Sequence, residues 1–178
     1  MEIYQSNRTG ILTARQSLVI IASYFLPNRT LRKHLKAAAR RGVAVKILLT
    51  GPSDVELSRL AEQYLAWWLQ KNGIRVFRWE RSVLHGKAIL ADDNWASLGS
   101  YNVNRLSRIR SVELNVDILD PGFVQYFRDY LDDLLTNHCV EITADPRSLF
   151  PSRLARWKAQ LAYHVAVYLM RILFPERR

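Results

Sequence analysis

The sequence predicts an α/β protein in which a mixed β-sheet carries helices on both faces. Short apolar runs rich in β-branched residues alternate with longer stretches of helical periodicity, which is typical of parallel strand pairing. Two later strands are joined by a tight turn, which adds an antiparallel hairpin. Hydrophobic residues make up 49% of the 178 residues, enough for a packed core in one domain.

Strands are predicted where short apolar or alternating runs are bounded by turn residues. They cover residues 17–23, 43–49, 74–80, 85–91, 95–100 and 111–119. The fourth and fifth are joined at 92–94, where the sequence Asp-Asp-Asn predicts a hairpin turn. In the last strand, alternation puts Glu113 on the face opposite Val112 and Leu114.

Helices are predicted between and after these strands, over residues 30–41, 54–71, 121–135 and 151–174. Thr30 can cap the first helix, and Gly42 can adopt the left-handed conformation that ends it. Ser53 or Asp54 can cap the second helix, which stops near Gly73. The chain therefore divides into a folded domain over 1–145 and a helical tail over 146–178.

The charge balance points to an anionic partner. The formal net charge is +10, and the pI is about 10.1. The helix at 30–41 and its flanks are rich in Lys and Arg and contain no acid, so they would attract lipid headgroups and nucleic-acid phosphates alike. No stretch of 18 uncharged apolar residues occurs, so a membrane-spanning helix is not predicted.

The stretch LHGKAILADDNWASLGSYNVN, residues 84–104, concentrates reactive side chains. Residues two apart in a strand point the same way, so His85 and Lys87 project together, as do Ser100 and Asn102 after the hairpin. Such a patch suits a phosphodiester, because Lys87 and Asn102 can stabilise charge on the non-bridging oxygens while an imidazole attacks phosphorus. A carboxylate would fix the imidazole tautomer, and Glu113 is the candidate.

Two further residues have competing explanations. Asp92 is counted among the candidate catalytic residues with His85, Lys87, Asn102 and Glu113, although it lies at the strand end, where holding the turn is a more natural role than contacting substrate. Tyr24 lies at the end of the first strand, where loops reach an active site, although core packing explains this position equally well. The four histidines are scattered and Cys139 is alone, so no metal site, cofactor or internal disulfide is predicted.

These residues resemble the signature of the phospholipase D superfamily, H-x-K-x4-D-x6-G-S-x-N. It is matched by His85, Lys87, Asp92, Gly99, Ser100 and Asn102. Residues 16 to about 141 look like the C-terminal half of a bacterial cardiolipin synthase. The resemblance implies a phospholipase D-like half fold and phosphatidyl transfer through a phosphohistidine, without metal or cofactor. It places Glu113 against the histidine and Gly99 and Ser100 around the substrate, to which the position of Tyr24 at a strand end adds a third candidate for substrate binding.

The sequence departs from the family in carrying one motif where the family's enzymes use two. His34-x-Lys36 lacks the following Asp and Gly-Ser-x-Asn and lies in a predicted helix, so it is dismissed. The second motif would come from a homodimer mate or from a separate N-terminal half. His85 is then either the nucleophile or the general acid, and both roles stay open.

The tail over 151–174 is amphipathic. At 100° per residue Trp157, Leu161, Val165, Leu169 and Leu173 lie apart from a basic and polar stripe, to which Lys158 is the exception. That stripe consists of Arg153, Arg156, Gln160, His164 and Arg171. The apolar stripe fits an in-plane membrane helix or packing against the chain's own domain or a partner half.

Three functions remain open from the sequence. The first is a cardiolipin synthase-like transferase acting on an anionic phospholipid such as phosphatidylglycerol, bound peripherally to the cytoplasmic side of a bacterial cytoplasmic membrane. The second is a phosphodiesterase, a phospholipase or nuclease, that uses water as acceptor. The third is an inactive fragment of a synthase. Nucleic acid is the less favoured partner, because the resemblance extends along the synthase half.

Overall fold

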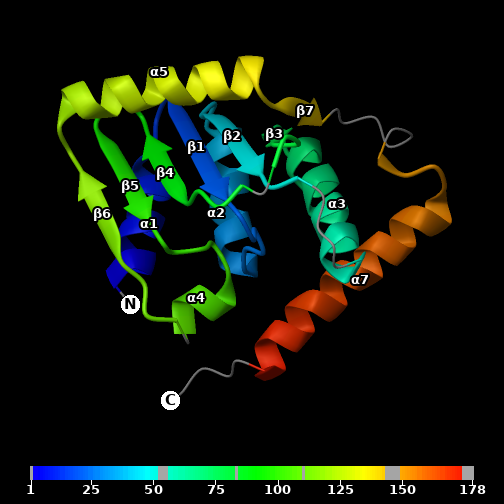
Figure 1. Cartoon of the computed structure of the whole chain (residues 1–178). Helices are drawn as coiled ribbons and strands as arrows, with labels where there is room; N and C mark the ends of the chain where they lie inside the picture. Colours follow the sequence, from blue (N-terminus) through cyan, green and yellow to red (C-terminus); the bar gives the residue numbers. More distant parts are fainter. Residues whose placement is uncertain (1, 52–55, 83, 110, 143–148, 174–178) are drawn as a thin grey trace.

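The structure is a computed structural model that describes residues 2–51, 56–82, 84–109, 111–142 and 149–173 (Figure 1). Its strands are β1 Ser17–Ala22, β2 Ala44–Leu49, β3 Arg75–Arg78, β4 Ala88–Ala91, β5 Trp95–Gly99, β6 Asn115–Ile118 and β7 Val140–Ile142. Its helices are α1 Glu2–Thr13, α2 Arg29–Arg40, α3 Glu56–Lys71, α4 Arg105–Ile109, α5 Pro121–Asn137 and α7 Arg153–Leu173.

The strands form one mixed sheet in the order β6-β5-β4-β1-β2-β3-β7. Strand β1 pairs with β2, and β2 with β3, in parallel, whereas every other pair is antiparallel. Helix α5 covers one face, and α1, α2 and α3 cover the other, with α7 packed outside α3 (Figure 1). The predicted α/β class and the mixed sheet are confirmed.

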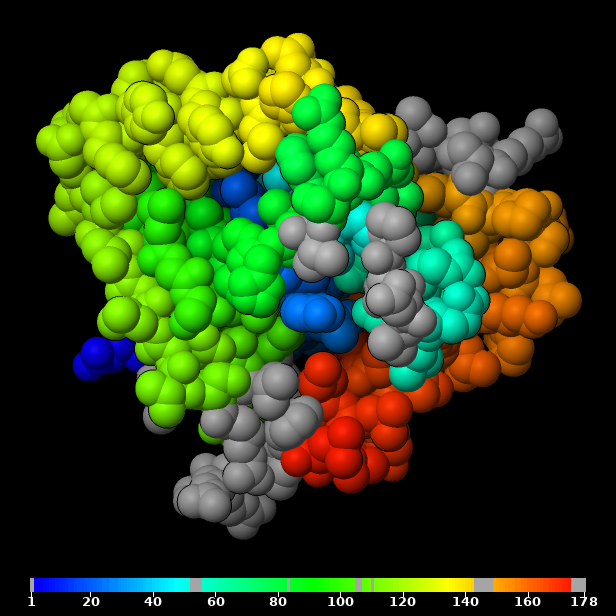
Figure 2. Space-filling view, in the orientation of Figure 1, coloured from blue at the N-terminus to red at the C-terminus, as the bar shows by residue number. Residues whose placement is uncertain are grey.

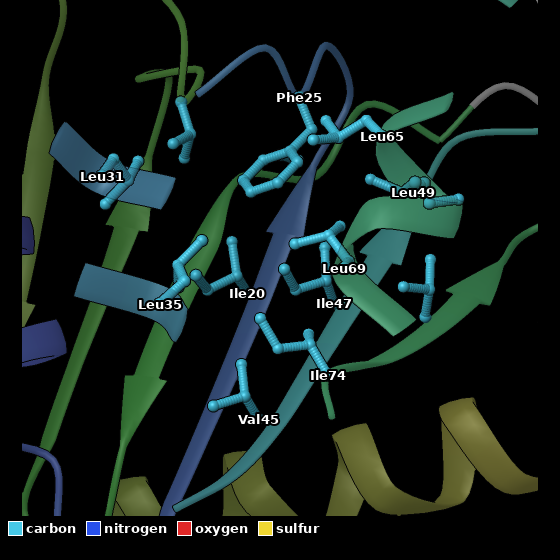
Figure 3. Close-up of a cluster of buried hydrophobic side chains, with 14 of the residues drawn as sticks. Ile20, Phe25, Leu31, Leu35, Val45, Ile47, Leu49, Leu65, Leu69 and Ile74 are labelled. Atoms are coloured by element: carbon cyan, nitrogen blue, oxygen red, sulfur yellow. The ribbon is translucent and has the colours of Figure 1, made fainter. Parts of the chain in front are cut away.

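Alternation along the strands separates two apolar layers. Even-numbered residues of β1, such as Leu18 and Ile20, face α1, α2 and α3, and the largest cluster of buried side chains lies there (Figure 3). Odd-numbered residues Val19 and Ile21 face Val124 and other apolar side chains of α5. Because both faces of the sheet are covered, the central strands consist of continuous apolar runs, and such runs are easily predicted as strands from the sequence.

Several strand boundaries differ from the prediction, because pairing partners limit each strand. Strand β4 begins at Ala88, which pairs with Ile21, and β1 ends one residue later, so residues 85–87 have no ladder partner. Strand β6 likewise begins at Asn115, opposite the last residue of β5. His85, Lys87 and Glu113 therefore lie just outside strands, not within them as predicted.

The helix ends agree with the sequence in part. Gly42 and Gly73 have positive φ angles of 90° and 79°, as a left-handed C-terminal glycine requires. Asn28 caps α2 by accepting a hydrogen bond from the Leu31 N–H at 2.8 Å, so the expected cap at Thr30 is wrong. The expected caps of the next helix, Ser53 and Asp54, lie outside the described residues.

Helices α1 and α4 and strand β7 are absent from the sequence prediction. Helix α1 contains glycine, asparagine and threonine, which are weak helix formers, so tertiary contacts must hold it. Ile11 is buried in the core, and the missing side chain of Gly10 leaves room for the Trp95 indole.

Helix α7 packs on α3 through one narrow face. Ala159, Ala162, Tyr163 and Ala166 are buried, and the ring centroids of Tyr163 and Tyr64 lie 5.3 Å apart. The Arg32 guanidinium lies 5.1 Å from the centroids of both the Tyr163 and the Trp68 rings, which ties α2, α3 and α7 together. None of the helices in the described part of the chain is long and apolar enough to cross a membrane.

Helix α3 also buries a carboxyl group whose protonation should control stability. Burial raises the pKa of Glu62 to about 7, although Arg78 pulls it downward. The neutral form is favoured in the fold, so this group supports stability fully below its ordinary pKa of 4.5 and loses that support as pH rises through about 7.

We expect Glu62→Gln, which keeps the shape but stays neutral, to leave stability nearly unchanged at pH 5. At pH 8.5 it should raise the free energy of unfolding by about 2 to 3 kcal/mol. Urea denaturation at both pH values measures the difference. The exposed Glu56→Gln on the same helix is the control, with little change at either pH. Equal effects of Glu62→Gln at pH 5 and 8.5 would contradict the assignment.

Candidate active site

The sheet topology brings the motif residues to one end of the central strands. Strand β1 ends there at Ala22, antiparallel β4 begins there, β5 ends there at Gly99, and β6 begins there. The backbone N–H of Gly99 donates to the Lys87 carbonyl at 3.2 Å, which joins the two halves of the motif. The loop that follows β1, the residues that precede β4 and the segment after β5 therefore converge.

Lys87 is the buried cation of this cluster. Its side chain is 8% exposed, and its ammonium donates to Ser23 Oγ at 3.2 Å and to the His85 carbonyl at 2.7 Å. Burial lowers the pKa of the Lys87 ammonium, and the Glu113 carboxylate partly offsets this effect. A cation held by two fixed acceptors is positioned without much loss of entropy when an anion binds.

His85 lies beside this cation but is exposed. Among the described residues its imidazole has no hydrogen-bond partner, so both ring nitrogens are free to meet a substrate. The expected hydrogen bond from the His85 imidazole to the Glu113 carboxylate is not formed in this structure, and the role of Glu113 in fixing the His85 tautomer stays a prediction. The hydrogen bond from the Lys87 ammonium to the His85 carbonyl still holds the backbone of His85 in place.

Glu113 instead contacts the residues that end β5. Its carboxylate accepts from Ser100 Oγ at 2.5 Å, and the same oxygen of Ser100 accepts from the Leu114 N–H at 3.0 Å. At Gly99 a Cβ atom would lie 2.1 Å from the Leu114 carbonyl oxygen, so only glycine allows these two backbone segments to approach this closely. Gly99 and Ser100 thus position the segment that leads to Asn102. The Glu113 carboxylate also acts electrostatically on the Lys87 ammonium.

Asn102 carries an unpaired polar atom. Its Oδ1 is buried and has no hydrogen-bond partner among the residues that the structure describes. Its backbone N–H donates to Ser107 Oγ at 3.2 Å, and the Ser107 N–H donates to Asn104 Oδ1 at 3.0 Å, a bond that caps α4. A buried amide oxygen without a partner is costly, which makes Asn102 a candidate for a polar contact with a ligand or with water.

Asp92 is not brought into this cluster. It follows the other end of β4, has a φ of 50°, and its carboxylate accepts from the backbone N–H groups of Arg15, Gln16 and Ser17 at 2.8 to 3.2 Å. Burial alone would raise the pKa of Asp92, but these hydrogen bonds and Arg128 lower it overall. In this structure Asp92 holds the start of β1, in agreement with the turn-holding role that its position favours, and its place among the catalytic residues stays a prediction.

One residue of the site, Ser23, carries no clear signal in the sequence. Ser23 contacts Lys87 only because β1 and β4 pair, and no spacing rule predicts that pairing. Asn104 and Ser107 do follow the pattern of a helix N-cap and its third residue, so this short capped turn was detectable. Tyr24 is 53% exposed beside the site, and its carbonyl accepts from Asn104 Nδ2 at 3.3 Å, whereas neighbouring Phe25 is in the core.

The fold and the His85–Lys87 cluster define a phospholipase D-like domain. A family model described as "Cardiolipin synthase, PLD-like domain" matches residues 8–135, and the chain belongs to this family. It is 36% identical over 154 residues to cardiolipin synthase B from Escherichia coli strain K12, covering 85% of this chain and 36% of that protein. The chain thus spans about a third of the length of the curated relatives it matches.

Solved structures share the fold. The phospholipase D family member Nuc from Salmonella typhimurium is 23% identical, with a TM-score of 0.67, covering 78% of this chain and 90% of that one. Phosphatidylserine synthase from Haemophilus influenzae Rd KW20 is 19% identical, with a TM-score of 0.72, covering 97% of this chain and 43% of that one. The latter likeness must include most of the 21-residue α7.

Among the described residues no group of three or more His, Cys, Asp or Glu could hold a metal ion.

Proposed function

We propose that this chain forms one half of a phosphatidyltransferase site of the cardiolipin synthase type. His85 is one of the two histidines of the reaction. The other comes from a second motif, supplied by a homodimer mate or by a separate N-terminal half. The chain contains one complete motif, so a second polypeptide segment must complete the site.

The observation that carries the proposal is the exposed imidazole beside a fixed, buried cation. Lys87 is held 2.7 Å from the His85 carbonyl, and the unpaired Oδ1 of Asn102 belongs to the adjoining segment. This arrangement offers a nucleophile or proton donor, a positive charge for the non-bridging oxygens and an amide for further polar contact. Within the described part of the chain, the exposed ring makes no contact that the fold needs, so it is available to a substrate.

The chemistry proceeds in two displacements. An imidazole lone pair of one histidine attacks the phosphorus of a phosphatidylglycerol. The bond from phosphorus to the oxygen of the headgroup glycerol breaks, and the second histidine protonates the departing alkoxide. That second histidine then removes a proton from a hydroxyl of another phosphatidylglycerol. The hydroxyl oxygen displaces the first histidine, which leaves cardiolipin and glycerol as products. Lys87 stabilises the negative charge in both transition states.

Phospholipid is favoured over nucleic acid as the substrate because of the relatives that share this sequence. The similarity to cardiolipin synthases A and B extends over 78% to 86% of this chain. The likeness to a phosphatidylserine synthase covers 97% of it, α7 included, and supports the same choice at the level of fold. We propose a peripheral location on the cytoplasmic side of a bacterial membrane, in keeping with this substrate.

Mass spectrometry of products from phosphatidylglycerol vesicles tests the function. The purified chain is incubated alone and after mixing with the N-terminal part of a cardiolipin synthase B, and its sedimentation is measured in parallel. We expect cardiolipin and glycerol, either from a dimer of the chain alone or only after mixing. Phosphatidic acid would instead identify water as the acceptor. No product from a dimer or from the mixture would contradict catalysis and leave an inactive fragment.

A further inference from the structure

Helix α7 exposes an apolar stripe on the side opposite its packing contact. Its inner face of Ala159, Ala162, Tyr163 and Ala166 lies on α3. The outer stripe recurs every three or four residues and consists of Leu154, Trp157, Leu161, Val165, Tyr168 and Ile172, each between 38% and 62% exposed. The alternative in which the chain's own domain covers Trp157, Leu161 and Val165 is therefore wrong in this structure.

The exposed stripe is large for a protein surface. Six neighbouring apolar side chains expose on the order of several hundred Å², a size that marks interaction surfaces. Helix α7 lies at the edge of the molecule, in orange to red (Figure 2). The outer face of a helix is convex, so it does not enclose a peptide or a small molecule, but it can lie along a flat apolar phase.

Charge decides which partner this face fits. Helix α7 contains no acidic residue, and at 100° per residue Arg153 and Arg171 lie along one side of the stripe and Lys158 along the other. Two copies packed through this face would bring these cations together without an acid of α7 between them, which opposes self-association. Anionic headgroups would neutralise them, while Trp157 and Tyr168 match the boundary between headgroups and acyl chains.

We propose that the outer face of α7 binds an anionic lipid surface, with the helix lying in the plane of the membrane. Its apolar stripe enters the boundary of the acyl region, and Arg153, Lys158 and Arg171 contact the headgroups. Because α7 contacts α4, and α4 follows the Asn102 segment, binding through α7 would bring the lipid surface close to the candidate site. The inference goes beyond the proposed function and holds whether or not His85 performs chemistry.

Flotation of the full chain with vesicles tests this surface. The vesicles contain either phosphatidylcholine alone or phosphatidylcholine mixed with phosphatidylglycerol. We expect Leu161→Glu with Val165→Glu to weaken binding to the mixed vesicles at least tenfold, because two charges enter the acyl boundary. The matched control is Tyr126→Glu with Tyr130→Glu on the exposed side of α5, which should bind as the wild type does.

Three further results decide the interpretation. Arg153→Gln with Lys158→Gln and Arg171→Gln should reduce the preference for phosphatidylglycerol and the sensitivity of binding to salt. His85→Ala should bind like the wild type, so failure of catalysis and failure of membrane binding are distinguished. The proposal would be overturned if the Leu161→Glu, Val165→Glu variant floated with the vesicles as the wild type does. It would also be overturned if the wild type were a dimer that these substitutions convert to a monomer, because α7 would then be a protein interface.

Discussion

His85→Ala should abolish phosphatidyl transfer, with a loss of at least about 10³-fold in rate under conditions where the wild-type site is active. The reason is that the imidazole either forms the bond to phosphorus or moves the proton of the leaving oxygen, and no neighbouring group replaces it. The exposed ring makes no hydrogen bond among the described residues, so its removal leaves the fold intact. Cardiolipin formation and thermal unfolding, measured side by side, check both parts.

The chain offers a matched control for this substitution. His34 is followed by Lys36 at the same spacing but lies in α2, away from the motif, and burial together with Arg8 lowers the pKa of its imidazole. His34→Ala should keep activity within about twofold once corrected for folded protein. A His85→Ala protein that retains wild-type activity would exclude this imidazole from the reaction, whatever the control does.

The central strands and the motif could be predicted from the sequence, because both depend on local pattern. Buried strands such as β1 are continuous apolar runs, and the spacing from His85 to Asn102 is a property of one hairpin. The ends of the strands could not be predicted, because they depend on which strands pair. Ser23, which fixes Lys87, is a site residue only through the pairing of β1 with β4.

The two faces of α7 show a different limit. Helical periodicity identified an apolar stripe and left open what covers it, since amphipathicity is the same for a membrane and for a protein partner. The structure shows that a second, alanine-rich face with Tyr163 makes the contact with α3. Small side chains give a weak hydropathy signal although they allow close helix approach, so this face was easy to overlook. Arg156, expected with the other cations, lies over the Trp67 ring on the inner side.

Asp92→Ala should destabilise the fold by about 1 to 3 kcal/mol while leaving the chemistry of the site unchanged. The substitution removes the acceptor for the N–H groups of Arg15, Gln16 and Ser17 near the start of β1, of which the first two are exposed and Ser17 is half-buried, so water replaces only part of what is lost. It also places alanine at a φ of 50°, a conformation that Asp tolerates better. Urea denaturation at pH 7 measures the loss, and Asp92→Asn, which keeps one acceptor and the tolerance, should lose about half as much.

The pH dependence separates this structural role from a catalytic one. Because the folded-state pKa of Asp92 is lowered from its ordinary value of 3.8, its contribution is complete well above that value and is lost as pH falls below it. The stability difference between wild type and Asp92→Ala should therefore be full at pH 7 and shrink toward pH 3. Activity of Asp92→Asn, assayed at low temperature and per folded molecule, should stay within a few-fold of wild type. An Asp92→Asn protein of unchanged stability and lost activity would return this carboxylate to the reaction, and would require the strand end to reach the substrate.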